Sequence, residues 1–123
     1  MIKLFHLTPK SKLANILKEG LDPKYSKSSL KAIFFTNDLF TAQNYSSMKD
    51  ETEFVILAVD VKNLNPKELG PDNYELQNWL ESKANDTNHD HWEDVDWKFS
   101  LEKVNQVAYY GIIDPSIIEI IKN

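Results

Sequence analysis

Hydrophobic residues recur along the chain in short runs, and the spacing within each run predicts a strand or a helix. Residues 2–7 and 104–110 alternate between apolar and polar positions, as half-buried strands do. Residues 32–36 form a short apolar and aromatic run, which favours a strand. The run over residues 53–61 is apolar at most positions, which predicts a strand covered on both faces. Residues 117–121 predict a last strand or a helical turn.

Helical spacing is clearest after the first strand. Three apolar side chains at i, i+3 and i+4 form one stripe there: Leu13, Ile16 and Leu17. The Thr8-Pro9 pair predicts the start of this helix, because Thr caps free amides and Pro suits the first helical turn. Gly20 predicts a left-handed stop, after which Leu21 can fold back onto the stripe.

Two further short helices are expected, over residues 39–45 and 73–80, so the elements together predict an α+β protein. The length of 123 residues is that of one domain, spanning residues 1–123. Hydrophobic residues make up 41% and charged residues 27%, which excludes a wholly disordered or fibrous chain. The absence of cysteine excludes a disulfide framework, a thiolate metal site and a thiol nucleophile.

Charged residues are unevenly distributed along the chain. The net charge is −5, but residues 1–31 contain seven lysines and two acidic residues, a net charge of +5. The overall charge excludes a protein that holds nucleic acid mainly by positive charge. The basic segment either faces an anion or is an ordinary solvated surface.

Membrane and export signals are not found in the sequence. No apolar run approaches the ~20 residues that a membrane span needs. The first residues lack the apolar stretch and cleavage site of a signal peptide. We therefore expect a cytoplasmic protein with no membrane partner.

The acidic segment over residues 89–97 contains a His-x-His pattern, formed by His89 and His91, with carboxylates nearby. Imidazole and carboxylate groups can bind zinc or a similar ion. The spacing is generic, however, and the same composition is typical of an exposed acidic loop anchored by Trp92 or Trp97. We expect the loop, and hence no metal site.

A series of short motifs follows a specific order along the chain. They are His6 on the first strand, Ile16-Leu17-Lys18-Glu19-Gly20-Leu21, Ala32-Ile33-Phe34-Phe35, Ala42-Gln43-Asn44-Tyr45, and Asn105-Gln106-Val107-Ala108-Tyr109-Tyr110. The step from Phe34 to Tyr45 is 11 residues. In this order and spacing, the sequence resembles the ADP-ribosyltransferase superfamily, and the poly(ADP-ribose) polymerase branch in particular, over residues 2–61 and 100–118.

The resemblance implies a split β-sheet with a cleft for nicotinamide adenine dinucleotide (NAD). It implies that His6 hydrogen-bonds a ribose hydroxyl of NAD, to which a histidine can donate near neutral pH. The backbone of Leu7 would hold the nicotinamide carboxamide, and Thr8 is included with the cofactor-binding positions. Phe34 and Tyr45 would stack on the two faces of the nicotinamide ring, since aromatic faces attract a cation. The basic segment would meet the pyrophosphate.

Gln106 stands where the family has its catalytic glutamate. Cleavage of the glycosidic bond builds positive charge on the ribose, and a carboxylate would stabilise that charge. An amide can hydrogen-bond a ribose hydroxyl, but it carries no charge and is not a base. Either the acceptor brings its own base, or Glu102 or Asp114 substitutes, or the protein binds without reacting.

The function expected from the resemblance is mono-ADP-ribosyl transfer from NAD to a protein or nucleic-acid acceptor, with His6 and Gln106 as the catalytic residues. One alternative is a degenerate module that binds NAD or ADP-ribose without chemistry. Another is an RNA 2′-phosphotransferase, which the absence of arginine disfavours, because arginine is the preferred phosphate ligand. His6, Phe34, Tyr45 and Gln106 also have ordinary structural interpretations, as a satisfied histidine, core aromatics and a polar strand residue.

Overall fold

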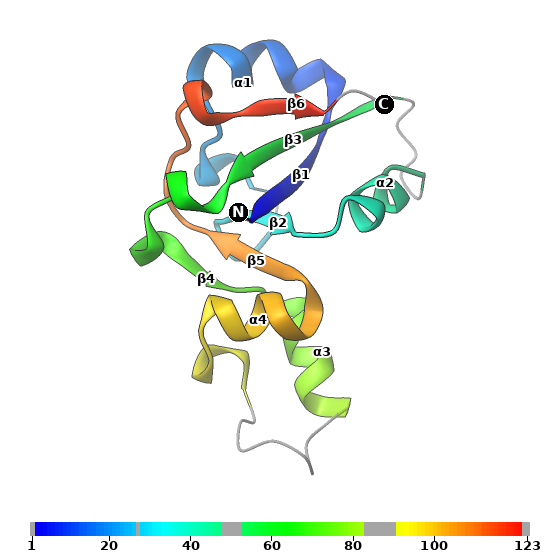
Figure 1. Cartoon of the computed structure of the whole chain (residues 1–123), viewed down its shortest axis with the longest axis vertical. Helices are drawn as coiled ribbons and strands as arrows, with labels where there is room; N and C mark the ends of the chain where they lie inside the picture. Colours follow the sequence, from blue (N-terminus) through cyan, green and yellow to red (C-terminus); the bar gives the residue numbers. More distant parts are fainter. Residues whose placement is uncertain (1, 27, 48–52, 83–90, 122–123) are drawn as a thin grey trace.

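An antiparallel sheet of six strands, in the order β4-β5-β2-β1-β3-β6, forms the centre of the computed structural model (Figure 1). The structure describes residues 2–26, 28–47, 53–82 and 91–121, without the side chains of 45–47. The strands are β1 (Lys3–Pro9), β2 (Ile33–Thr36), β3 (Phe54–Asp60), β4 (Leu69–Pro71), β5 (Gln106–Tyr109) and β6 (Glu119–Ile121). The α-helices are α1 (Leu13–Glu19), α2 (Leu39–Ser47), α3 (Tyr74–Ser82) and α4 (Trp97–Val104). The expected α+β class is confirmed.

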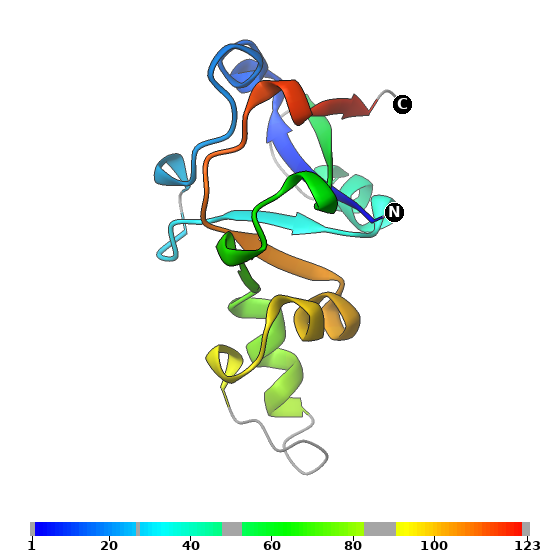
Figure 2. The same ribbon diagram turned by 60° about the vertical axis from the view of Figure 1, so that its left-hand side comes forward.

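Helix α1 lies at one end of the sheet, and α3 and α4 lie at the other. Figure 1 shows α3 and α4 together below β5, and α1 above β6, and the turned view in Figure 2 keeps this arrangement. The rings of Trp79 and Phe99 join α3 to α4 edge to face, with their centroids 5.8 Å apart. Short 3-10 helices connect several elements, among them η1 (Lys10–Lys12), η2 (Pro23–Tyr25) and η6 (Pro115–Ile117).

The core is built where the apolar runs meet. Its most deeply buried side chains include Leu4, Phe35, Leu57, Val107 and Ile113. Four consecutive residues of β3, from 56 to 59, are all buried, which confirms the expected strand with two covered faces. Burial of such side chains from five separate segments holds the sheet together by the hydrophobic effect.

The sheet opens between its two central strands. β1 pairs with β3 along its whole length, from Lys3 opposite Asp60 to Pro9 opposite Phe54. By contrast, β1 pairs with β2 only at Phe5, which lies opposite Thr36. The sheet therefore consists of two halves, β4-β5-β2 and β1-β3-β6, which diverge beyond this single pair.

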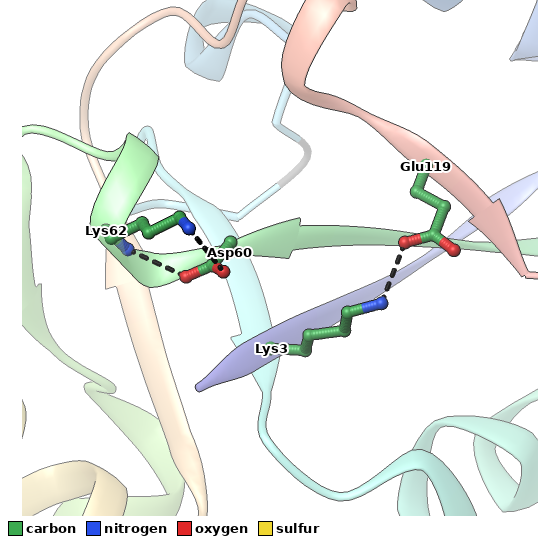
Figure 3. Close-up of polar contacts among 4 residues, drawn as sticks. All are labelled: Lys3, Asp60, Lys62 and Glu119. Carbon is green, nitrogen blue, oxygen red and sulfur yellow. Dashed lines mark hydrogen bonds and ion pairs between the residues drawn. The ribbon is translucent and has the colours of Figure 1, made fainter. Parts of the chain in front are cut away.

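The outer strands of one half are joined by a surface ion pair. Lys3 Nζ lies 2.9 Å from Glu119 Oε2, and Figure 3 shows the two side chains meeting across the intervening β3. Next to it, Asp60 Oδ1 accepts the amide hydrogen of Lys62 at 3.1 Å (Figure 3). Exposed pairs of this kind contribute at most about 1 kcal/mol. Lys3 of β1 is thus paired with Glu119 of β6.

The start of α1 differs from the expectation. Thr8 does not cap the helix, because it is buried within β1, opposite Val55 of β3. The strand continues to Pro9, a 3-10 turn follows, and α1 begins only at Leu13 without a side-chain cap. Proline is tolerated at the end of a strand as well as in the first turn of a helix, so the Thr-Pro pair is compatible with either element. Leu17 is 46% exposed and lies outside the core, unlike the rest of the expected stripe.

The end of α1 agrees with the expectation in part. Gly20 has the expected positive φ of 88°, but its ψ of −172° is extended and does not correspond to a left-handed helical stop. Leu21 is buried in the core cluster with Ile16, as predicted.

Two elements are absent from the sequence prediction. Residues 97–104 form α4, where the prediction began a strand at 104; Asp96 Oδ1 caps this helix at the amide of Phe99, 2.9 Å away. Asn105 ends it in the left-handed region at a φ of 63°, and β5 starts one residue later. The Gly70-Pro71 pair, expected to be only a break, lies in β4.

Candidate functional site

Two adjoining cavities, which we call the β1/β2 cleft, lie beside the opening of the sheet. Both are lined by His6, Leu7, Pro9, Lys12 and Phe34. The α3-side cavity has a volume of about 520 Å³ and continues to Gln106 and residues 72–75, and the α1-side cavity of about 540 Å³ continues to α1 and η2. Each volume is within the ~300–1,000 Å³ typical of small-molecule sites.

His6 connects the two halves of the sheet where their main chains no longer pair. Its Nδ1 lies 2.8 Å from the carbonyl oxygen of Phe34, and its ring contacts Phe35 with the centroids 5.6 Å apart. Burial lowers the pKa of His6 below its ordinary value; the Phe34 hydrogen bond acts in the opposite direction, and Lys12 lowers the pKa further. The ring is therefore neutral at pH 7.

The tautomer of His6 follows from this contact. A carbonyl oxygen can only accept, so the hydrogen of the neutral ring is on Nδ1 and the lone pair is on Nε2. His6 can therefore accept a hydrogen bond from a ribose hydroxyl at Nε2. The donor role expected from the sequence would require the doubly protonated ring, because the single hydrogen of the neutral ring already bonds Phe34.

The lowered pKa of His6 predicts that the folded protein loses stability in mild acid. Below pH 6.5 the unfolded chain takes up a proton at His6 that the folded chain does not bind. The free energy of unfolding therefore decreases as the pH is lowered, until the pH reaches the pKa of His6 in the folded protein. A single group contributes at most about 1.4 kcal/mol per pH unit. Urea unfolding between pH 7.5 and 5.5 measures the slope. His6→Asn, which keeps a donor for Phe34, should flatten it; an equal slope in both proteins would contradict the prediction.

The other expected NAD-binding residues differ in how far the structure describes them. Phe34 is half-buried on β2 and lines both cavities, as does Leu7 on β1. Thr8 is buried and lines the α1-side cavity. Tyr45 belongs to α2, but its side chain lies outside the described residues. The structure thus brings together one aromatic ring, His6 and the main chain after it.

Gln106 is the first residue of β5 and lies opposite Thr36 of β2. It lines the α3-side cavity with His6 and Phe34, although a hundred residues separate it from His6 in the sequence. Its carbonyl oxygen accepts the hydroxyl hydrogen of Ser100 on α4 at 2.6 Å. The structure therefore brings His6, Phe34 and Gln106 to the lining of one cavity.

The carboxylates suggested as substitutes for the missing glutamate lie elsewhere. Glu102 is exposed on α4, where it lies 3.8 Å from Lys103. Asp114 accepts the amide hydrogen of Ser116 at 2.9 Å and caps η6. Neither residue lines the described β1/β2 cleft.

Two other carboxylates reach the cleft, and the sequence analysis missed both. The pairing of β4 with β5 places Pro71 opposite Val107, so the next residue, Asp72, continues beside Gln106. Asp72 and Glu75 both line the α3-side cavity. Their spacing is that of an Asp-x-x-Glu helix start, a signal that could have located α3 but not the cavity.

Asp72 is buried and held by hydrogen bonds. Its Oδ1 accepts the amide hydrogen of Glu75 at 2.8 Å, and its own amide donates to Ser100 Oγ at 3.0 Å. Burial raises the pKa of this carboxyl, whereas hydrogen bonds from the amides of Glu75, Tyr74 and Leu76 act in the opposite direction. Asp72 thus caps α3 and connects it to α4.

Among the described lysines of the basic segment, Lys12 lines both cavities. Other lysines of this segment have acidic partners: Lys10 Nζ lies 3.2 Å from Glu53, and Lys24 Nζ lies 3.7 Å from Asp22. Lys12 is therefore a described lysine of the basic segment that is placed to meet an anion in the cleft.

The possible metal site at His89 and His91 is described only in part, because His89 lies outside the described residues. Within the part of the chain that is described, no cluster of three or more potential ligands could hold a metal ion. That same part contains no helix with the length and apolar character needed to span a membrane.

Comparison with known proteins assigns no family to this chain. No family model matches it, and no curated protein is similar to it in sequence. Its function therefore has to be inferred from the residues of the β1/β2 cleft.

Proposed function

We propose that the β1/β2 cleft binds NAD and that the protein is a mono-ADP-ribosyltransferase with a protein or nucleic-acid acceptor. The observation that carries this proposal is the meeting of His6, Phe34 and Gln106 around one cavity at the opening of the sheet. These three are among the residues for which the family resemblance implies contacts with NAD.

The nicotinamide half of NAD fits the chemistry of the α3-side cavity. The Phe34 ring offers a face to the pyridinium cation, a contact worth about 0.5–2 kcal/mol. The neutral His6 ring offers Nε2 to a ribose hydroxyl. Beyond Phe5 the described strand β1 has no paired residue in β2, so the main chain around Leu7 can serve a carboxamide, which both donates and accepts.

The pyrophosphate would bind beside Lys12. This side chain lies on η1, between the two cavities, and its charge already acts on His6. An ammonium group held near a cleft is a point-charge ligand for phosphate. A dinucleotide is long enough to occupy both cavities, with its two halves on either side of Lys12.

Binding is tested by thermal denaturation with NAD, ADP-ribose and nicotinamide. A ligand at 100 times its dissociation constant should add about 2.7 kcal/mol to the free energy of unfolding. Lys12→Ala should weaken NAD binding about 10-fold, since it removes one charge-assisted hydrogen bond at an exposed position. Lys18→Ala is the matched control, because Lys18 lies on α1 and lines neither described cavity. Equal NAD affinity in both variants would argue against Lys12 as a ligand, and no NAD effect on the wild type would refute the binding site.

Transfer is tested with NAD labelled in the adenosine half and a cell extract as the source of acceptors. Label retained on macromolecules, together with released nicotinamide, is the expected result. Sensitivity of the labelled product to protease or to nuclease identifies the acceptor class. Binding of NAD without nicotinamide release would instead favour the degenerate binding module, for which the specific observation is the uncharged Gln106 in the α3-side cavity.

A further inference from the structure

Glu75, in the first turn of α3, lines the α3-side cavity, which Gln106 also lines. The residue is half-buried, and its amide is fixed by Asp72 at 2.8 Å. Its carboxylate has no ion pair or hydrogen bond within the described chain. A half-buried carboxylate without a partner, beside a cavity that lacks a charged group at Gln106, is available for chemistry.

We propose that Glu75 supplies the negative charge that Gln106 lacks and accepts the proton of the attacking nucleophile. This assignment rests on the proposed ADP-ribosyl transfer. The two residues then act together on the ribose, because the amide of Gln106 positions a hydroxyl while the carboxylate of Glu75 opposes the developing positive charge.

Asp72 is less suited to this role than Glu75, although both line the cavity. Its carboxylate is buried and already accepts hydrogen bonds from the start of α3. If the Asp72 carboxylate took part in the reaction, it would give up these hydrogen bonds and leave helix α3, which carries Glu75, without its N-terminal cap. Asp72 therefore holds the wall in place, and Glu75 faces the reaction.

The step balances with water as the simplest acceptor. The bond between the ribose C1′ and the nicotinamide nitrogen breaks, and nicotinamide leaves with the electron pair. The water oxygen bonds to C1′, and its proton goes to Glu75. The products are ADP-ribose and nicotinamide, with no change of oxidation state. A hydroxyl of a macromolecule would replace water in the transfer reaction.

The test uses the full chain with NAD alone, and nicotinamide release is measured. Glu75→Gln should lower kcat about 100-fold, as expected for loss of one transition-state charge contact, with the NAD dissociation constant changed less than about 3-fold. Glu81→Gln makes the same substitution on the same helix at an exposed position outside the described cavity, and it should retain wild-type turnover. Urea unfolding of both variants shows whether the fold is intact.

A second variant checks the division of roles. Glu75→Gln combined with Gln106→Glu should recover at least about 10-fold of the lost turnover, because it returns a carboxylate to the same cavity. Unchanged kcat in Glu75→Gln would overturn the role of Glu75 while leaving the proposed function in place. A wild type that binds NAD but releases no nicotinamide would also overturn it. A wild type that does not bind NAD would remove the proposed function itself.

Discussion

Ser100→Ala is expected to lower the free energy of unfolding by about 1–3 kcal/mol, because it removes both hydrogen bonds of a buried hydroxyl, one of which satisfies the buried amide of Asp72. Ser100 is fully buried on α4. Its hydroxyl accepts from the amide of Asp72 at 3.0 Å and donates to the carbonyl of Gln106 at 2.6 Å. One side chain therefore connects the start of α3, helix α4 and strand β5.

Urea denaturation monitored by circular dichroism measures this loss. Ser82→Ala is the matched control, since Ser82 is exposed and its hydroxyl donates, within the described residues, to the nearby carbonyl of Trp79 in its own helix; it should change stability by less than about 0.5 kcal/mol. Because Ser100 positions both Asp72 and Gln106, nicotinamide release should also fall in the Ser100 variant under conditions where it remains folded. Equal stability of the two variants would show that the buried network contributes little.

The elements that could be predicted from sequence are those whose signal is local. β3 and β2 are continuous apolar runs, and α3 follows its expected range closely. α4 could also have been found, because Asp96 precedes it as a cap and Trp97, Leu101 and Val104 stand at i, i+4 and i+7. The alternation after Val104 obscured this signal, since it extended the predicted strand backwards into the helix.

The elements that could not be predicted depend on long-range pairing. β4 has three residues, and nothing in the sequence of Gly70 and Pro71 favours a strand; it exists because β5 offers a free edge. Gly70 also receives the ring of Tyr110 so closely that a Cβ would lie 2.9 Å from a ring carbon. Tertiary contacts here override local preference.

The candidate site likewise depends on long-range contacts that the local sequence does not reveal. The convergence of His6, Phe34 and Gln106 was expected only through the family resemblance, because no local pattern connects residues so distant in sequence. The place of Glu75 in the cavity depends on the β4–β5 register, which sequence alone does not reveal. The tautomer of His6 likewise depends on one carbonyl contact, to Phe34.

Gly20→Ala is expected to cost about 3 kcal/mol or more. At a φ of 88° and ψ of −172°, Gly20 occupies a backbone region that is essentially restricted to glycine, which alone costs about 1–3 kcal/mol for another residue. An added Cβ would also overlap the carbonyl oxygen of Ile113 and lie 3.2 Å from Pro115 Cδ. That carbonyl accepts the amide hydrogen of Leu21 at 3.0 Å, and the amide of Ile113 returns a bond of 2.8 Å. The substitution would therefore disrupt the bridge that joins the end of α1 to the segment before η6.

Thermal and urea unfolding measure this loss, with Gly111→Ala as the control. Gly111 lacks a positive φ, and the nearest atoms that its Cβ would meet are side-chain atoms, at 3.1 Å or more. The cost of Gly111→Ala should therefore stay near 1 kcal/mol.

Gly20→Asn tests whether position 20 needs the extended backbone that only glycine adopts or an ordinary left-handed helix stop. Asparagine tolerates the left-handed helical region but not a positive φ with an extended ψ, so Gly20→Asn should be as damaging as Gly20→Ala. A mild effect of asparagine would mean that the chain can rotate into a left-handed cap. Because Gly20 and Leu21 line the α1-side cavity, the Gly20 variants should also lose NAD affinity more than the Gly111 control does.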